Sequence, residues 1–383
     1  MDAPVYLDHN ATTPVLPEVV DAMLPWLRDG FGNPSSGHAY GRRAASAVAT
    51  AREQVAALIG ARADEIVFTS GGTEASNLAI RGLRPRDPAR DHLVTSVVEH
   101  PATARPLAVL EAAGARVTRL PVDVRGVVVP DGEFSARTAL LTVMHANNET
   151  GVLQPIAELA AQAHAVGAHV HTDAAQSLGK VRVNVEDLGV DLLTIAGHKL
   201  YAPKGVGALY VRTSTPLQPI LFGAGHERGL RPGTENVPYL VGLGVACARA
   251  AADLDAEAAR VGALRDRLWG LLHADLPDLV RHGAGADVLP NTLSLRVPGQ
   301  LGAAILDACP EIAASTGSAC HEGDWTASAV ITAMGVPEHD ALGTLRLTLG
   351  RGTSEAAVDR AAHALVRAIT GLRDAPDPSP APR

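Results

Sequence analysis

Short apolar runs alternate with amphipathic stretches through the first half of the chain. Runs of about four to eight apolar or β-branched residues are typical of buried strands, and apolar residues that recur every three or four positions are typical of helices. Three expected strands each precede an expected helix, and these pairs are 66–69 with 73–83, 93–98 with 102–113, and 139–144 with 156–166. This alternation predicts βαβ units and therefore a mainly parallel sheet with helices on both faces.

Two further apolar strands end beside ionisable residues. The strand 168–172 is followed by Asp173, and the strand that begins at Asp191 runs into His198 and Lys199. Ligands on parallel sheets bind beyond the carboxyl ends of the strands. The polar residues at or just past such ends are Ser70, His100, Asn148, Asp173 and Lys199. Their common position predicts one shared site.

The pattern changes near residue 250. The segment 245–272 predicts one or two amphipathic helices, whereas 291–297 and 345–349 alternate as half-buried strands do. These elements predict a second, smaller α+β domain.

The domain boundaries follow from this change of pattern. We expect residues 15–254 to form the large domain, and residues 1–14 and 255–373 to form the small one. Residues 374–383 contain four prolines and few apolar groups, a composition that predicts a disordered tail.

Composition narrows the class of protein. The 383 residues suffice for two domains, and the net charge of −8 argues against a nucleic-acid-binding face. An N-terminal signal segment and an apolar run of transmembrane length are both absent from the sequence, so we expect no membrane partner. Three cysteines without a C-x-x-C spacing favour a reducing cytoplasm, and we expect no metal, because the strand residues His169 and His171 lack a third ligand.

Lys199 and Asp173 point to one kind of cofactor. A lysine amine forms a Schiff base with an aldehyde, and a carboxylate at a strand end pairs with a pyridinium nitrogen. Together they suggest pyridoxal phosphate (PLP). The segment Ser70-Gly-Gly-Thr-Glu74 leaves a strand and opens a helix, as anion-binding turns do, although a simple turn with a threonine cap is the alternative.

Other polar residues allow a functional and a structural interpretation. His100 is suited to stack on a cofactor ring and move protons, or it is a strand-end histidine. Asn148 and Gln176 either hydrogen-bond a ligand or serve turn chemistry. Cys320 lies in a small-residue loop and favours a reactive thiol. Arg346 lies within an apolar strand, so it needs an anionic partner, which is either a substrate carboxylate or an internal carboxylate.

These residues, in this order, resemble the cysteine desulfurases, which are fold-type I PLP enzymes of the class V aminotransferase superfamily. The resemblance runs from Tyr6-Leu-Asp-His-Asn-Ala-Thr-Thr13 through Gly32-Asn-Pro-Ser-Ser36 to Leu349-Gly-Arg351. Its most specific motifs are Gly-His-Lys199, Asp173-Ala-Ala-Gln176, Arg231-Pro-Gly-Thr-Glu-Asn236 and Gly-Ser-Ala-Cys320. It implies a large domain with a mainly parallel sheet of the seven-stranded type, and a small domain that carries the Cys320 loop.

The resemblance also implies a role for each site residue. Lys199 would hold PLP as a Schiff base, Asp173 would pair the ring nitrogen, and His100 would stack on the ring. Gln176 would contact the phenolic oxygen. The phosphate would be bound by Gly72, Thr73 and His198, and by Thr234 from a neighbouring subunit of a homodimer. Asn148 and Arg346 would hold the substrate carboxylate, and Cys320 would accept sulfur.

The implied reaction converts L-cysteine to L-alanine and leaves a persulfide on Cys320 for a sulfur-acceptor protein, as in iron–sulfur cluster assembly. Two departures resemble selenocysteine lyases instead: Ala196 replaces the family's serine before Gly-His-Lys, and His321-Glu322 follows the cysteine. The alternatives are therefore a selenocysteine lyase that releases selenide, an aminotransferase, and a PLP-binding scaffold.

Overall fold

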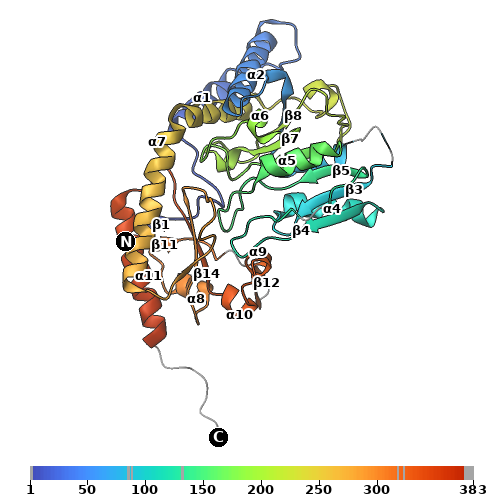
Figure 1. The fold of residues 1–383 in the computed structure, drawn as a ribbon. Helices are drawn as coiled ribbons and strands as arrows, with labels where there is room; N and C mark the ends of the chain where they lie inside the picture. The colour runs from blue at the N-terminus through green and yellow to red at the C-terminus, as the bar shows by residue number, and fades with distance from the viewer. Residues whose placement is uncertain are drawn as a thin grey trace.

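The computed structural model describes the side chains of residues 3–83, 87, 89–130, 133–316 and 326–374, and also the backbone of 319–321 and 324–325. A large sheet with its helices fills one part of the molecule, and a smaller assembly of strands and helices fills the other (Figure 1). Residues 375–383 of the expected tail lie outside the described residues, whereas Asp374 ends a helix.

The large sheet has seven strands in the order β2-β8-β7-β6-β5-β3-β4. Their bounds are β2 Ile66–Thr69, β3 His92–Ser96, β4 Arg116–Leu120, β5 Thr138–Thr142, β6 His169–Asp173, β7 Leu192–Ala196 and β8 Gly207–Val211. Strands β3 to β7 are parallel, and β8 is antiparallel to both β7 and β2. The predicted mainly parallel sheet is therefore confirmed.

Helices cover both faces of this sheet because its strands bury residues on both sides. In β2, Ile66 and Phe68 join the largest core, and Val67 between them joins a separate core on α3. The helices of this part are α1 Pro17–Arg28, α2 Ala39–Leu58, α3 Gly72–Gly82, α4 Pro101–Ala112, α5 Ile156–Ala165 and α6 Val185–Leu188. Of these, α3, α4 and α5 fall close to the predicted ranges 73–83, 102–113 and 156–166, whereas no expectation covered α1, α2 and α6.

The long helix α7, Val237–Asp275, links two hydrophobic cores (Figure 1). Leu243 in its first half is buried in the core of the large sheet, and Leu268 in its second half is buried in the other core. Between them, Asp253 leaves helical geometry with φ −136°. Among the described residues α7 is long and apolar enough to cross a membrane, but these two cores account for its apolar positions.

The second core is built on β10, Thr292–Arg296, and β14, Thr344–Thr348, against α7 and α11, Glu355–Asp374. The first strand, β1 Val5–Tyr6, pairs with β11, Ile312–Ala313, and Val5 and Leu7 are buried in this core. The remaining elements are β9 Val280–Arg281, α8 Gly302–Asp307, β12 Ala319–His321, β13 Asp324–Thr326, α9 Ala329–Ala333 and α10 Glu338–Ala341. Two separate cores support the proposed domain boundaries at 14/15 and 254/255, which stay a prediction.

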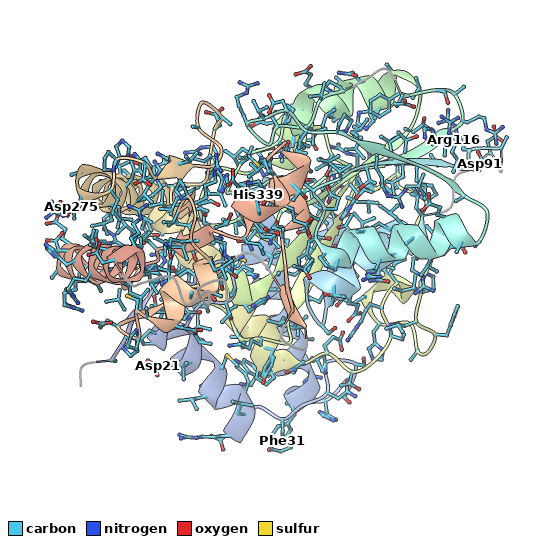
Figure 2. The ribbon with its side chains drawn as sticks, turned by 90° about the horizontal axis from the view of Figure 1, so that it is seen from below. Asp21, Phe31, Asp91, Arg116, Asp275 and His339 are labelled. Atoms are coloured by element: carbon cyan, nitrogen blue, oxygen red, sulfur yellow. The ribbon has the colours of Figure 1, made fainter. Side chains whose placement is uncertain are left out.

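Some large apolar side chains remain at the surface. Phe31 is 76% exposed and stacks on the exposed Tyr40 at a centroid distance of 5.4 Å. Figure 2 shows Phe31 at the edge of the molecule, next to the N-terminal helices. Phe222 is 89% exposed.

Leu268→Ala should lower the free energy of unfolding by about 2–5 kcal/mol, because it leaves a cavity among fully buried neighbours. Leu27→Ala is the matched control, since Leu27 is mostly exposed, and should change stability by less than about 0.5 kcal/mol. Urea unfolding followed by circular dichroism measures both. Equal stability of the two variants would contradict the assignment of α7 to the second core.

Candidate active site

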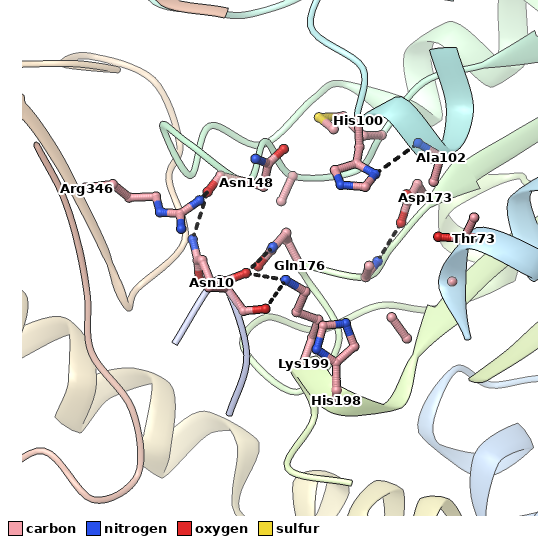
Figure 3. A pocket seen from close by; sticks show the side chains of 16 residues that line it. Asn10, Thr73, His100, Ala102, Asn148, Asp173, Gln176, His198, Lys199 and Arg346 are labelled. Atoms are coloured by element: carbon pink, nitrogen blue, oxygen red, sulfur yellow. Dashed lines mark hydrogen bonds between the residues drawn. The ribbon is translucent and has the colours of Figure 1, made fainter. Parts of the chain in front are cut away.

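One cavity of about 400 Å³ lies at the carboxyl end of the parallel strands (Figure 3). The sequence-predicted residues that line it are Gly72, Thr73, His100, Asn148, Asp173, Gln176, His198, Lys199 and Arg346. They come from five strand ends of the large sheet and from β14 of the second core. Four of the five strand-end residues expected to share a site therefore line one cavity between the two cores, whereas Ser70 lines an adjoining pocket with Gly72, Thr73 and His198.

Lys199 lies in a short 3-10 turn, Gly197–Lys199, directly after β7. Its Nζ donates hydrogen bonds to the backbone carbonyls of Ala11, at 2.7 Å, and of Asn10. Burial and the nearby Arg346 guanidinium lower the pKa of Lys199 to about 8. Much more of its amine is therefore neutral and nucleophilic near neutral pH than for an ordinary lysine, with pKa about 10.4.

Asp173 is the last residue of β6 and is only 7% exposed. Its Oδ1 accepts a hydrogen bond from the backbone N–H of Ala175 at 2.9 Å. Burial raises the pKa of Asp173, and the positive charges of His100 and Lys199 oppose that rise. Since no basic side chain among the described residues forms an ion pair with it, the carboxylate is suited to a cationic ligand group.

His100 lies on the other side of the cavity from Lys199 (Figure 3). Its Nδ1 accepts the N–H of Ala102 at 3.1 Å and so caps α4, whose first residue is Pro101. In the neutral ring the proton then resides on Nε2. The side chain is exposed to the cavity, yet surrounding protein atoms lower the pKa of His100 by desolvation. A neutral imidazole fits ring stacking and proton transfer.

Glu99, next to His100, is an acid with a buried carboxyl group to which the sequence analysis assigned no role. Glu99 accepts hydrogen bonds from the Ser96 hydroxyl at 2.6 Å and from the backbone N–H of Met144 at 3.0 Å. Burial raises the pKa of Glu99 to about 8. These bonds tie the end of β3 to the end of β5 and thereby hold His100 in place.

The start of α3 is suited to bind an anion. Gly71 is the N-cap and has no side-chain cap, so the first amide N–H groups of the helix lack intrahelical acceptors. A Cβ at Gly72 would lie 3.2 Å from the Cβ of Ala196, which shows how closely the turn approaches β7. Thr73 and His198 line the same end of the cavity. Because α3 begins at Gly72 and Gly71 is its N-cap, Thr73 lies inside the helix, and the alternative of a threonine cap is wrong.

Gln176 is held by residues that the sequence reasoning missed. Its Nε2 donates to the Asn10 carbonyl at 3.0 Å, and its Oε1 accepts from Lys180 at 3.1 Å. Asn10 in turn bonds Thr292 and Asn291 of the second core. Asn10 lies outside every expected strand and helix, and the resemblance assigned it no role.

Arg346 has an internal partner. Its Nη2 forms an ion pair with Asp8 at 2.8 Å, and its Nη1 donates to the backbone carbonyl of Asn148 at 3.1 Å. The Nε of this buried side chain has no hydrogen-bond partner. The internal carboxylate that the sequence analysis offered as one partner of Arg346 is therefore Asp8. The guanidinium also lines the cavity, so the carboxylate of an incoming substrate would compete with Asp8 for it.

Besides Ser70, two predicted residues are not placed in the cavity of this chain. Thr234 is exposed and is absent from the lining, although Arg231 in the same loop pairs with Glu74 of α3 at 2.9 Å. The side chain of Cys320 lies outside the described residues. Its backbone belongs to β12, opposite Trp325 of β13, so a hairpin occupies part of the segment where the sequence favoured a loop.

The chain resembles known proteins over nearly its whole length. Residues 5–361 match the family model described as Aminotransferase class-V. A cysteine desulfurase of Trichormus azollae is 45% identical over 374 residues, covering 96% of this chain and 94% of that protein. A selenocysteine lyase of Bos taurus is 42% identical, with 96% and 94% covered. The solved structure of a NifS-like protein matches with a TM-score of 0.88 and 33% identity, covering 97% and 99%.

The lowered pKa of Lys199 predicts a distinctive pH dependence in the cofactor-free protein. Only the neutral amine attacks an aldehyde, so the rate of reductive alkylation of Lys199 should rise with pH up to about 8 and then level off. Peptide mass spectrometry after aldehyde and borohydride treatment measures this rate. The variant Lys199→Arg identifies the relevant peptide. A rate that still rises steeply at pH 9.5, as for a solvated lysine, would contradict the burial of this amine.

Proposed function

Because the chain belongs to the class-V aminotransferase family, we propose that it is a PLP-dependent cysteine desulfurase that converts L-cysteine to L-alanine and carries the sulfur on Cys320. One observation supports this proposal most strongly. A lysine with a lowered pKa, a buried carboxylate and a histidine meet in one cavity, in a chain that is 45% identical to a cysteine desulfurase.

The cavity fits PLP by the chemistry of its groups. Asp173 would pair with the protonated ring nitrogen, and His100 would stack on the ring. The amides of Gly72 and Thr73 would bind the phosphate together with His198, and Gln176 Nε2 would donate to the phenolic oxygen. When bound to Lys199, PLP supplies an electron sink that acidifies the α-hydrogen of an amino acid. Ala196 leaves this phosphate site without the hydroxyl that serine would add.

The residues of the chain would then divide the reaction among them. Arg346 and the Asn148 carboxamide hold the substrate carboxylate, and Arg346 exchanges its bond to Asp8 for this one. The Lys199 amine removes the α-proton, and His100 moves protons on the other face. The Cys320 thiolate attacks the substrate sulfur, an S–S bond forms, the C–S bond breaks, and its electron pair is finally protonated to give alanine.

We further propose a homodimer in the cytoplasm. The exposed Thr234 lies outside the cavity of its own chain, so a neighbouring subunit could place it at a second phosphate. The exposed apolar residues Phe31, Tyr40 and Phe222 are suited to an interface. The persulfide would pass to a sulfur-acceptor protein, for iron–sulfur clusters or another sulfur-using pathway.

Selenocysteine lyase is the second candidate. Ala196 and His321-Glu322 favour it, and the bovine lyase is 42% identical to this chain. An aminotransferase would not need Cys320. A PLP-binding scaffold would not need Lys199, Asp173 and His100 to be intact together.

Cys320→Ser should separate these candidates, because it replaces a good sulfur nucleophile with a hydroxyl that is not ionised at neutral pH. We expect spectral changes on adding L-cysteine to persist, while alanine formation falls at least 100-fold. Alanine, sulfide and selenide are measured with L-cysteine and L-selenocysteine in separate reactions. Cys247→Ser changes a buried cysteine that does not line the cavity and controls for thiol loss.

The outcomes distinguish the candidates. Normal turnover of L-cysteine by Cys320→Ser would show that the proposed sulfur transfer is wrong. Loss of L-cysteine turnover with near-normal L-selenocysteine turnover would favour the lyase, because selenide leaves without nucleophilic attack more readily than sulfide does.

Thr234→Val should weaken PLP binding about tenfold if a neighbouring subunit supplies this hydroxyl, since one hydrogen bond to a charged group contributes roughly 1.5 kcal/mol. The dimer should remain, as light scattering would show. Thr213→Val, in the turn after β8, is a control. A wild-type protein that is monomeric and fully active would refute the shared site.

A further inference from the structure

Lys180 is a cation without an acidic partner. No Asp or Glu among the described residues lies within ion-pair distance of its Nζ. The side chain is partly buried, and its ammonium group is surrounded by protein. Desolvation, together with the charges of Lys199 and Arg346, lowers the pKa of Lys180 to about 7. Such a position costs free energy, so a compensating role is expected.

Among the described residues, the Lys180 ammonium group donates hydrogen bonds to one residue, Gln176. Its Nζ donates to the backbone carbonyl of Gln176 at 2.8 Å and to Gln176 Oε1 at 3.1 Å. In its charged form the Lys180 ammonium group only donates, so the carboxamide atom that faces it is oxygen. The NH2 group then faces the Asn10 carbonyl, which only accepts, at 3.0 Å. The hydrogen-bond network thus admits one orientation of this amide.

Lys180 does not reach the active-site cavity. It lines a second, small cavity behind the wall that carries Lys199, together with Glu257 and Arg351. Gln176 lines the active-site cavity. Lys180 can therefore affect a bound ligand only through its contact with Gln176 or through its own positive charge. That charge also contributes to the lowered pKa of His198.

We propose that Lys180 is a positioning residue, which locks the Gln176 carboxamide with its NH2 group toward the active-site cavity. This inference rests on the proposed function, in which that NH2 group donates to the phenolic oxygen of PLP. In the reversed orientation the amide oxygen would face the phenolate, and two acceptors would repel. Lys180 thereby selects the amide orientation that stabilises the deprotonated oxygen.

The test is a pH titration of the absorbance of bound PLP. A hydrogen bond donated to an oxygen stabilises its deprotonated form. Lys180→Met removes the donor that holds the carboxamide oxygen and leaves only the Asn10 carbonyl to orient the amide, so the midpoint of the absorbance change should rise by roughly one pH unit. Lys180→Gln retains an uncharged NH2 donor and should bring the midpoint at least halfway back to the wild-type value. Arg182→Gln removes an exposed cation two residues away and should leave the midpoint unchanged.

A merely structural role would have a different signature. Since an unpaired buried cation does not stabilise a fold, the melting temperature of cofactor-free Lys180→Met should equal or exceed that of the wild type. A large fall in melting temperature with an unchanged midpoint would show that Lys180 only braces the chain, and the proposal would fail. It would also fail if Lys180→Gln behaved like Lys180→Met.

Two results distinguish a failure of the proposed function from a failure of the role of Lys180. If the wild type held no PLP on Lys199, the proposed function and this inference would fall together. If the wild type held PLP and Lys180→Met titrated like the wild type, only the inference would be lost.

Discussion

The chemistry of the site depends on ionisable side chains that are buried together without enough oppositely charged partners. Asp173, His100 and Lys199 share one cavity, and burial raises the pKa of the acid and lowers those of the two bases. Burial therefore shifts each group toward its neutral form unless a partner compensates it. A ligand with a cationic ring nitrogen and an aldehyde would supply compensation to Asp173 and a reaction partner to Lys199. Burial of these groups therefore lowers the stability of the fold and at the same time makes Lys199 more nucleophilic and Asp173 ready for a cationic partner.

The cavity is held between two cores by a few long-range contacts. Asn10 connects Gln176 of the large domain with Thr292 of the second core. A second link lies farther out, where Arg351 forms a bidentate ion pair with Asp253 at the break in α7. These bonds position β14, and with it the substrate-facing arginine, relative to the sheet that carries the lysine.

The sequence predicted the order of elements and the gathering of polar residues at the strand ends. Both rest on local signals: apolar periodicity shows where a strand ends, and parallel strands bring their carboxyl ends to one edge. For Gln176 the residues left a ligand contact and turn chemistry both open, and the resemblance to the cysteine desulfurases selected the first; the role of Thr234 came only from that resemblance. Both roles remain predictions.

Other parts of the site had no local signal. Asp8 pairs with Arg346 across 338 positions of sequence, and Lys180 is an ordinary lysine in an ordinary turn until the fold encloses it. Burial of Glu99 depends likewise on the end of β5 packing over it. Such contacts arise from tertiary packing, which periodicity and motif spacing do not encode.

The central claim is that the buried charge of Asp173 is matched by a protonated ring nitrogen of PLP. Nitrogen-15 NMR of the protein loaded with ring-labelled PLP measures that protonation directly. The account predicts a protonated nitrogen at neutral pH in the wild type and an unprotonated one in Asp173→Asn. An unprotonated nitrogen in the wild type, or no difference between the two proteins, would contradict it.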